Sequence, residues 1–270
     1  MTIIFRAKSN EAYVLKILAE LLANNIKTGC FEIDETGIFL RMMDHHRKVL
    51  IDLNLSSAKS GFTMFKFNSK KMFLGINLNH FHKMLKSVKK KDSLELFIDD
   101  EFPNNLSIKV TPKENNRTTT STIKIQSIQN LEIDLPIGYS NSVSISSINY
   151  QKMLKELGNI GNMIQVNAKK YSIEFSCSAI GVYGRTVSFG ETEDDDNDNE
   201  LIYNEDFNTE TLGRISKLAG LSTNIQIFPG KPLYFKSNIG NLGEINIYIK
   251  SKEQIEKDSC NVDNSDSDYE

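Results

Sequence analysis

The sequence lacks the marks of a secreted or membrane-spanning protein. Its 270 residues hold three cysteines, and Cys30, Cys177 and Cys260 are scattered without a C-x-x-C pair. No apolar run is long enough to span a membrane, and the first residues, MTIIFRAKSN, do not contain the apolar core of a secretory signal. We therefore expect reduced thiols in an intracellular protein that has no membrane partner.

The motifs of common enzyme classes are missing as well. There is no G-x-x-x-x-G-K-[ST] phosphate loop, no G-x-S-x-G elbow and no H-E-x-x-H zinc motif. His80 and His82 would point about 200° apart on a helix, which is poor geometry for a shared metal ion. The segment DDDNDNELIYNE (194–205) has acids at calcium-loop positions, but Asn199 stands where that loop needs glycine. We expect no enzymatic activity, no metal site and no cofactor.

Negative charge is concentrated in two short segments. The chain has a net charge of −3, yet residues 191–200 contain seven acids and no base, and residues 251–270 contain seven acids and two lysines. The other 240 residues hold 30 basic and 21 acidic side chains, a net charge of +9. A basic body favours a polyanionic partner. We expect a solvated acidic loop at 191–200 and a disordered acidic tail at 251–270.

The chain contains one structural unit twice. HKMLKSVKKKDSLELF (82–97) aligns with GRISKLAGLSTNIQIF (213–228) at a constant offset of 131, and EAYVLKILAEL (11–21) resembles INYQKMLKELG (148–158) in its pattern. Strand-like runs follow these helical stretches. A Thr-, Asn- and Ser-rich stretch between the halves predicts a linker that is partly strand-paired. The predicted units are an N-terminal domain (1–122), a linker (123–140), a C-terminal domain (141–250) and the tail (251–270).

The segment HFHKMLKSVKKK (80–91) carries five lysines in an otherwise acidic chain. An α-helix advances 100° per residue, so Lys83, Lys86 and Lys90 of a helix that begins near Leu78 fall within an arc of roughly 60° opposite the apolar side. The ordinary reading of such a face is simple solvation.

Three further amphipathic helices also carry cations opposite their apolar stripes. These helices are predicted near 11–23, at 148–158 and around 209–219, and their outward cations are Lys16, Lys152, Lys155, Arg214 and Lys217. We expect Ala12 and Ala19 on the polar side of the first helix and Ala219 on the buried side of the last. Because acids are few on the four helices and gather in loops, we favour a shared anionic partner over solvation alone.

Four stretches in this order and spacing resemble the eukaryotic DNA sliding clamp family, proliferating cell nuclear antigen, from Thr2 to about Lys250. They are LRMMD (40–44), GFTMFKFNSKKMFLGINLNHFHKMLK (61–86), MLKELGNIGNMIQVNAKKYSIEFSCSA (153–179) and PLYFK (232–236). The resemblance implies an α+β chain of two similar βαβββαβββ clamp domains. It further implies that three chains close head to tail into a ring with helices inside and sheets outside.

The resemblance also implies two sets of site residues. Those expected to face double-stranded DNA, without sequence preference, are Lys16, Lys83, Lys86, Lys152, Lys155 and Lys217, with Arg214 added from the internal repeat. Those expected in a pocket for partner peptides are Met43, Ile133, Leu135, Pro136, Pro232 and Tyr248. Ring closure is expected to pair LSIKVT (106–111) with VYGRTVSF (182–189) of the next subunit.

Two departures from the family pattern lie beside the expected pocket. Arg47-Lys48 replaces a His-Val pair, and Lys250-Ser251-Lys252 replaces an Ala-Pro-Lys that follows the family's C-terminal tyrosine. We therefore expect an altered peptide preference.

The function implied is that of a homotrimeric DNA polymerase processivity factor, working with a polymerase, a clamp loader and other peptide-motif proteins. It would act in the nucleus, or in a viral replication compartment if the Asn- and Ile-rich composition reflects a large DNA virus. The alternatives left open are a subunit of a heterotrimeric checkpoint-type ring, a viral transcription or replication accessory factor, and a monomeric nucleic-acid-binding protein.

Overall fold

A computed structural model describes residues 3–114, 117–179, 181–190 and 201–265. The elements of the first half are β1 (Ile3–Ser9), α1 (Ala12–Asn25), β2 (Thr28–Asp34), β3 (Gly37–Met43), β4 (Val49–Ser56), β5 (Phe62–Phe67), β6 (Met72–Asn77), α2 (Leu78–Leu85), β7 (Ser93–Asp99), β8 (Asn105–Thr111) and β9 (Thr119–Lys124). Those of the second half are β10 (Val143–Ser146), α3 (Ser147–Gly158), β11 (Met163–Ala168), β12 (Ser172–Ala179), β13 (Tyr183–Gly190), β14 (Tyr203–Asn208), α4 (Thr209–Arg214), the 3-10 helix η2 (Ser216–Gly220), β15 (Asn224–Phe228), β16 (Leu233–Ile239), β17 (Gly243–Ile249) and α5 (Lys252–Ser265).

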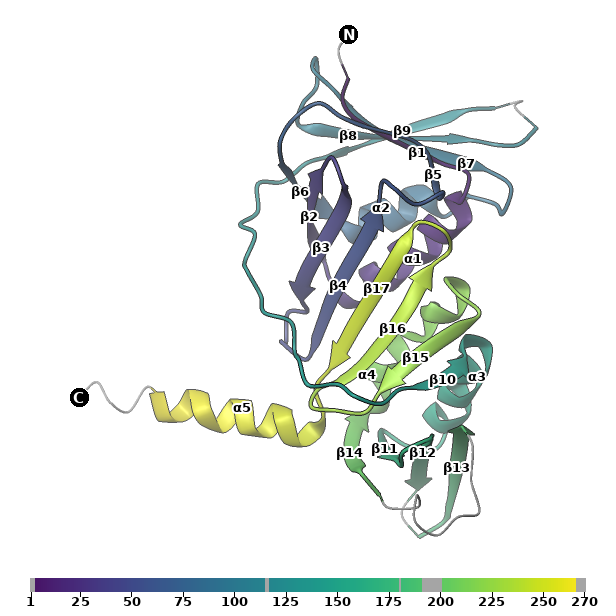
Figure 1. The fold of residues 1–270 in the computed structure, drawn as a ribbon, viewed down its shortest axis with the longest axis vertical. Helices are drawn as coiled ribbons and strands as arrows, with labels where there is room; N and C mark the ends of the chain where they lie inside the picture. The colour runs from purple at the N-terminus through teal and green to yellow at the C-terminus, as the bar shows by residue number, and fades with distance from the viewer. Residues whose placement is uncertain (1–2, 115–116, 180, 191–200, 266–270) are drawn as a thin grey trace.

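The two halves share one sheet. Its eight strands have the order β10-β15-β16-β17-β4-β3-β2-β6, four from each half, and β17 joins β4 from Gly243 opposite Leu55 to Ile249 opposite Val49. Two flanking sheets, β5-β1-β7-β8-β9 and β13-β12-β11-β14, lie at the ends of the molecule (Figure 1). The pairing of β17 with β4 therefore makes one surface of both halves.

The helices of both halves cover one face of this central sheet. Figure 1 shows α1, α2, α3 and α4 behind it. Their apolar stripes are buried, with Leu21, Leu85 and Leu157 fully covered. Helix α1 reaches η2 across the middle of the molecule, where a methyl group on Gly220 would come within 2.8 Å of the Ile17 side chain. The four predicted helices are thus present, and they form one layer.

The α+β class and the two similar domains expected from the sequence are confirmed, with more strands between the helices than the expected unit contains. Five strands separate α1 from α2, and four separate α3 from α4 among the described residues. In the first half the polar turn at 68–71 divides the apolar run of 61–77 into β5, which pairs with β1, and β6, which pairs with β2. The extra strands therefore belong to different sheets.

Three expectations about the helices were wrong. Helix α2 ends at Leu85, so Lys90 lies in the following turn, where the Asp92 carboxylate accepts the Lys89 N–H at 2.8 Å. The predicted helix at 209–219 breaks at Ile215 into α4 and η2, and this change of pitch buries Leu218 in place of Ala219.

Ala12 and Ala19 are fully buried, against expectation. Helix α1 lies between other elements of the helical layer, packing on both α2 and η2, and small side chains allow that close approach. The polar side of α1 is therefore narrower than the periodicity of the sequence predicts.

The expected edge strand of the first half was also wrong. LSIKVT belongs to β8, which is paired on both sides, because Thr119–Lys124 folds back on it as β9. The free edges are β9 in one flanking sheet and β13, the predicted strand, in the other.

The expected disordered tail is a helix through Ser265, and residues 266–270 lie outside the described part of the chain. A capping box starts α5: the Gln254 N–H donates to Ser251 Oγ at 3.3 Å, and the Ser251 N–H donates to Gln254 Oε1 at 3.1 Å. Glu253 pairs with Lys257 one turn later at 2.5 Å. These local interactions offset the low apolar content of the segment.

Two smaller findings complete the description. Cys30, Cys177 and Cys260 are free thiols. None of the described helices combines the length and apolar character that crossing a membrane would require.

We predict that Gly243→Ala destabilises the protein by about 2 kcal/mol or more, because a methyl group there would overlap the Asn54 carbonyl of the facing strand. At fixed protein concentration, the melting temperature should fall by roughly 4–8 °C. Gly213→Ala is the matched control, since nothing lies within 4 Å of a methyl group at that helical position. Equal melting temperatures for the two variants would contradict the close packing of β17 on β4.

Candidate nucleic-acid interface and peptide pocket

Four of the seven predicted DNA-facing cations are exposed and unpaired within the described part of the chain. Lys83 and Lys86 lie at the end of α2, and Lys152 and Lys155 lie on α3. The buried residues of these helices face the central sheet, so the lysines point away from it. The ammonium groups are free to meet an anion.

Lys16 is half-buried and differs from those four. Its Nζ donates to the backbone carbonyls of Lys86 at 2.7 Å and Val88 at 3.0 Å. These carbonyls follow α2, where the helix dipole favours a positive charge. Lys16 therefore ties α1 to the end of α2 and holds the chain beside Lys86.

The two predicted cations of the last helical region are ion-paired. Lys217 of η2 contacts Glu20 of α1 at 2.8 Å, which connects the two halves. Arg214 contacts Glu210 at 2.7 Å, and the hydrogen bond and charge of Arg214 lower the pKa of Glu210. Both pairs are partly exposed, so the acids reduce the positive charge of this region without covering it.

One aromatic residue of this face was missed in the sequence. The ring of Tyr13 lies 5.5 Å from Lys16 Nζ and 5.9 Å from Lys90 Nζ, within cation–π range. Its position three residues before Lys16 on α1 was the available signal, but the contact with Lys90 depends on the turn after α2. The result is a cationic patch around a half-buried ring.

The linker is fixed to the sheet at three points. The Gln126 N–H donates to the Gly75 carbonyl at 2.8 Å, Arg41 Nη1 donates to the Ile133 carbonyl at 3.2 Å, and the Tyr139 hydroxyl donates to the Pro232 carbonyl at 2.6 Å. Glycine is needed at both ends, because a methyl group on Gly75 would meet Ile128 at 2.7 Å and one on Gly230 would meet the Tyr139 ring at 2.6 Å. Figure 1 shows this segment descending beside β6 and crossing the ends of β17 and β16.

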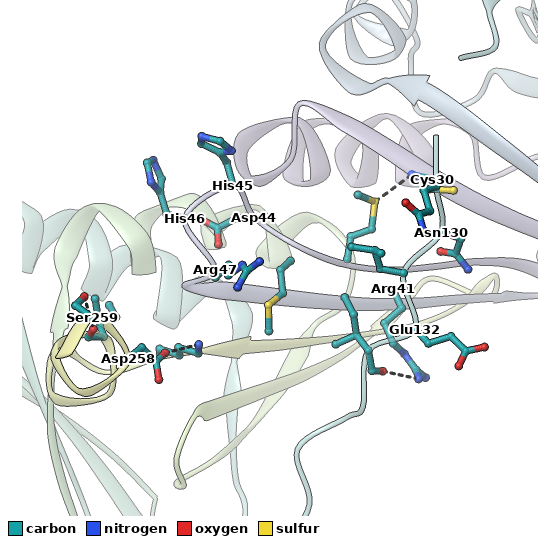
Figure 2. Close-up of a pocket in the computed structure, with 17 residues that line it drawn as sticks. Cys30, Arg41, Asp44, His45, His46, Arg47, Asn130, Glu132, Asp258 and Ser259 are labelled. Atoms are coloured by element: carbon teal, nitrogen blue, oxygen red, sulfur yellow. Dashed lines mark hydrogen bonds and ion pairs between the residues drawn. The ribbon is translucent and has the colours of Figure 1, made fainter. Parts of the chain in front are cut away.

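A cavity of about 770 Å³ opens beside the linker. Its walls are linker residues 129–133, the β3–β4 hairpin and the first two turns of α5 (Figure 2). Met43 and Ile133 are the two residues predicted for a peptide pocket that line it.

The other four predicted pocket residues lie outside this lining. Leu135 and Pro136 are half-buried on the linker, and the carbonyl of Pro232 holds Tyr139. Tyr248 is 6% exposed and stacks on Tyr234 with ring centroids 4.6 Å apart. Tyr139 packs over both rings, and burial raises its pKa, which keeps the hydroxyl a hydrogen-bond donor. The linker's own tyrosine thus covers the surface around Tyr248.

The cationic rim of the pocket was missed in the sequence. His45, His46 and Arg47 project from the hairpin tip, with Lys250 at the base of α5 (Figure 2). The buried Asp44 carboxylate closes this hairpin by accepting the N–H groups of Lys48 at 2.7 Å and Val49 at 2.9 Å. The aspartate before HHRK was a turn signal, but only the tertiary structure brings the turn opposite α5.

Among the residues that the structure describes, no group of three or more His, Cys, Asp or Glu side chains gathers as a metal site would require. The acidic segment 191–200, with most of the calcium-like motif, lies outside those residues. Glu205, the last residue of that motif, lies on β14 and pairs with Lys231.

Comparisons with known proteins agree with this architecture. Sequence models described as proliferating cell nuclear antigen, N-terminal domain, and proliferating cell nuclear antigen, C-terminal domain, match residues 4–134 and 134–252. A crystal structure of proliferating cellular nuclear antigen from Entamoeba histolytica superimposes with a TM-score of 0.80 at 21% identity, covering 93% of this chain and all of that one.

Three curated relatives match over nearly their whole lengths. Uncharacterized protein 436R of Invertebrate iridescent virus 6 is 25% identical over 94% of both chains. The DNA polymerase sliding clamp of Nitrosopumilus maritimus is 25% identical, and the proliferating cell nuclear antigen of Chaetomium thermophilum is 22% identical. Each of these last two matches covers 91% of this chain and 97% of the relative.

Two clamp domains that share a sheet, with helices on one face and a linker on the other, define the class of DNA sliding clamps. The chain belongs to the proliferating cell nuclear antigen family. It is a clamp of DNA replication, in a family whose members are not enzymes.

We predict that Ser251→Ala loosens α5 by removing its cap. Loss of an N-cap side chain costs about 1 kcal/mol, so amide hydrogen exchange in 252–265 should accelerate about fivefold. Ser259→Ala is the control, because Ser259 Oγ bonds only the Ile255 carbonyl inside the same helix, at 2.9 Å. Faster exchange in both variants alike would contradict the role of the cap.

Proposed function

We propose that this chain is a DNA polymerase processivity factor that forms a homotrimeric ring around duplex DNA. The observation that carries the proposal is the set of four exposed, unpaired lysines on the helical face, opposite the face that bears the linker and the pocket. The family membership supports it. The ring would hold a polymerase, a clamp loader and other partners by short peptides bound at the pocket.

The residues on the helical face suit a sliding contact. Lysine is a flexible point charge, and phosphate contacts alone give affinity without reading a base sequence. Lys83, Lys86, Lys152 and Lys155 would exchange phosphates as the ring moves. Lys16 would position the end of α2, and Lys217 and Arg214 would contribute a field weakened by their acids.

Ring closure would use the two free edges. Strand β9 ends one flanking sheet and β13 ends the other, and each leaves backbone groups without a partner strand among the described residues. Pairing β9 of one copy with β13 of the next is heterologous, and such contacts form closed rings when the rotation closes. Encirclement would then retain the protein while each lysine contact stays weak.

The alternative is a clamp with another assignment. The match to a protein of an iridescent virus favours a viral replication or transcription accessory factor acting in a viral replication compartment over one acting in the nucleus. A subunit of a heterotrimeric ring is the remaining possibility. The state of the purified chain separates it from a self-closing ring.

We predict that the purified chain has a native mass three times the 30.6 kDa of one chain. Light scattering across the micromolar range measures this directly. A mass of one chain throughout that range would argue against self-closure and favour a heteromeric ring.

We also predict that reversing Lys83 and Lys86 together to Glu lowers stimulation of a DNA polymerase on a primed template on the order of tenfold, because repulsion replaces two phosphate contacts. The trimer should persist, since neither ammonium contacts another described residue. The matched control reverses Lys59 and Lys70, two exposed lysines in turns outside the helical layer. Equal stimulation by both double variants would remove the assignment of DNA to this face.

A further inference from the structure

We propose that the pocket binds a partner segment with an acidic residue beside its apolar anchor, and that Arg47 contacts this acid. The proposal rests on the proposed function, in which this pocket docks partner peptides. It adds a chemical preference to that role.

The interior of the pocket calls for an apolar anchor. Met42, Met43, Leu131, Ile133 and Ile255 lie in its lining, and Leu131 is 62% exposed. Methionine side chains adapt to the shape of what they contact. A cavity of about 770 Å³ with such walls can take a few apolar side chains of a peptide.

Most of the rim charges already have partners. Arg41 contacts Asp52 at 2.8 Å and also holds the linker carbonyl of Ile133. Lys250 contacts Asp258 of α5 at 2.6 Å. Asp44 is buried and accepts backbone N–H groups, as described above. These groups build the walls of the pocket.

Arg47 is the cation left over. Its side chain is exposed and lines the pocket, and no described acid pairs with its guanidinium. Glu132, the unpaired acid of the lining, lies on the linker wall close enough to Lys71 to help raise the pKa of that lysine. The opening between the hairpin and α5 therefore has a surplus of positive charge.

The hairpin holds Arg47 in place. Its backbone has φ 55°, its N–H donates to the Asp44 carbonyl at 3.0 Å, and the Asp44 N–H donates to the Val49 carbonyl at 2.8 Å. A guanidinium on so tight a turn is pre-organised for a carboxylate, which it can bind with two parallel hydrogen bonds. The contact between Lys250 and Asp258 shows an acid already seated on the neighbouring cation of the same rim.

A peptide fits these observations better than a nucleic acid does. A nucleic-acid groove needs a row of free cations along the backbone and flat aromatic platforms. This pocket has one uncommitted guanidinium and a floor of methionine, leucine and isoleucine.

The test compares three labelled peptides that differ at one position. Each carries the same isoleucine and phenylalanine anchor, with Glu, Gln or Lys beside it, and fluorescence anisotropy measures binding to the full chain. We expect the Glu peptide to bind about fivefold more tightly than the Gln peptide, as befits one partly exposed charged contact. Raising the ionic strength from about 0.05 M to 0.5 M should reduce that ratio through screening.

Arg47 variants identify the contact. R47Q should abolish the preference for Glu over Gln, and R47E should favour the Lys peptide. The matched control is K48Q, which removes a charge from the next residue, outside the lining, and should keep the preference. M43A should weaken all three peptides alike, because it removes part of the apolar floor.

Two results would overturn the inference alone. Equal binding of the Glu and Gln peptides to the wild-type chain would leave a docking pocket without the acidic preference. Arg47-dependent displacement of a bound peptide by single-stranded oligonucleotide would assign the rim to nucleic acid. Failure of all three peptides to bind, or binding unaffected by M43A, would instead remove the pocket from the proposed function.

Discussion

The antiparallel pairing of β17 with β4 is the constraint on which the rest of the molecule depends. These strands are nearly 190 residues apart in the sequence, and their ladder runs without a break from Gly243 to Ile249. Because it converts two four-strand halves into one sheet, it places the helices of both halves on the same face. The position of every candidate site residue relative to the others follows from this ladder.

A shared sheet has two faces, and the chain uses them for different chemistry. On the helical face, acids neutralise the cations that lie near the junction of the halves, as Glu20 does for Lys217, while the lysines of α2 and α3 stay free. A polyanion passing over this face would meet mobile charges on a rigid layer. On the opposite face the linker is held at both ends and in the middle, which leaves a cavity of defined walls beside it.

Local patterns in the sequence predicted the helical face well. The apolar periodicity around Lys83 and Lys152 reports which side of a helix is buried, and that information lies within a few turns of chain. The prediction was wrong where a partner distant in sequence decides the outcome. The burial of Ala19 depends on the neighbours of α1 in the helical layer, and the edge passed from β8 to β9 because a polar segment folded back.

The pocket was the least predictable feature, for the same reason. Its walls come from a hairpin near residue 45, a linker near 130 and a helix beginning at 252, and no local pattern relates them. The capping box at Ser251 was readable as a helix start, but the acidic composition that follows suggested disorder instead.

The two departures from the family pattern nevertheless have a common meaning. Arg47 and Lys250 occur far apart in the sequence, yet they line opposite walls of the same cavity. Lys250 leads into Ser251, whose cap turns the chain into α5, and Asp258 of that helix then occupies the ammonium of Lys250. Arg47 keeps its charge available. Substitutions that both add a wall to one pocket and leave a single cation open on its rim change what the pocket can hold, while the sheet beneath them stays as the family builds it.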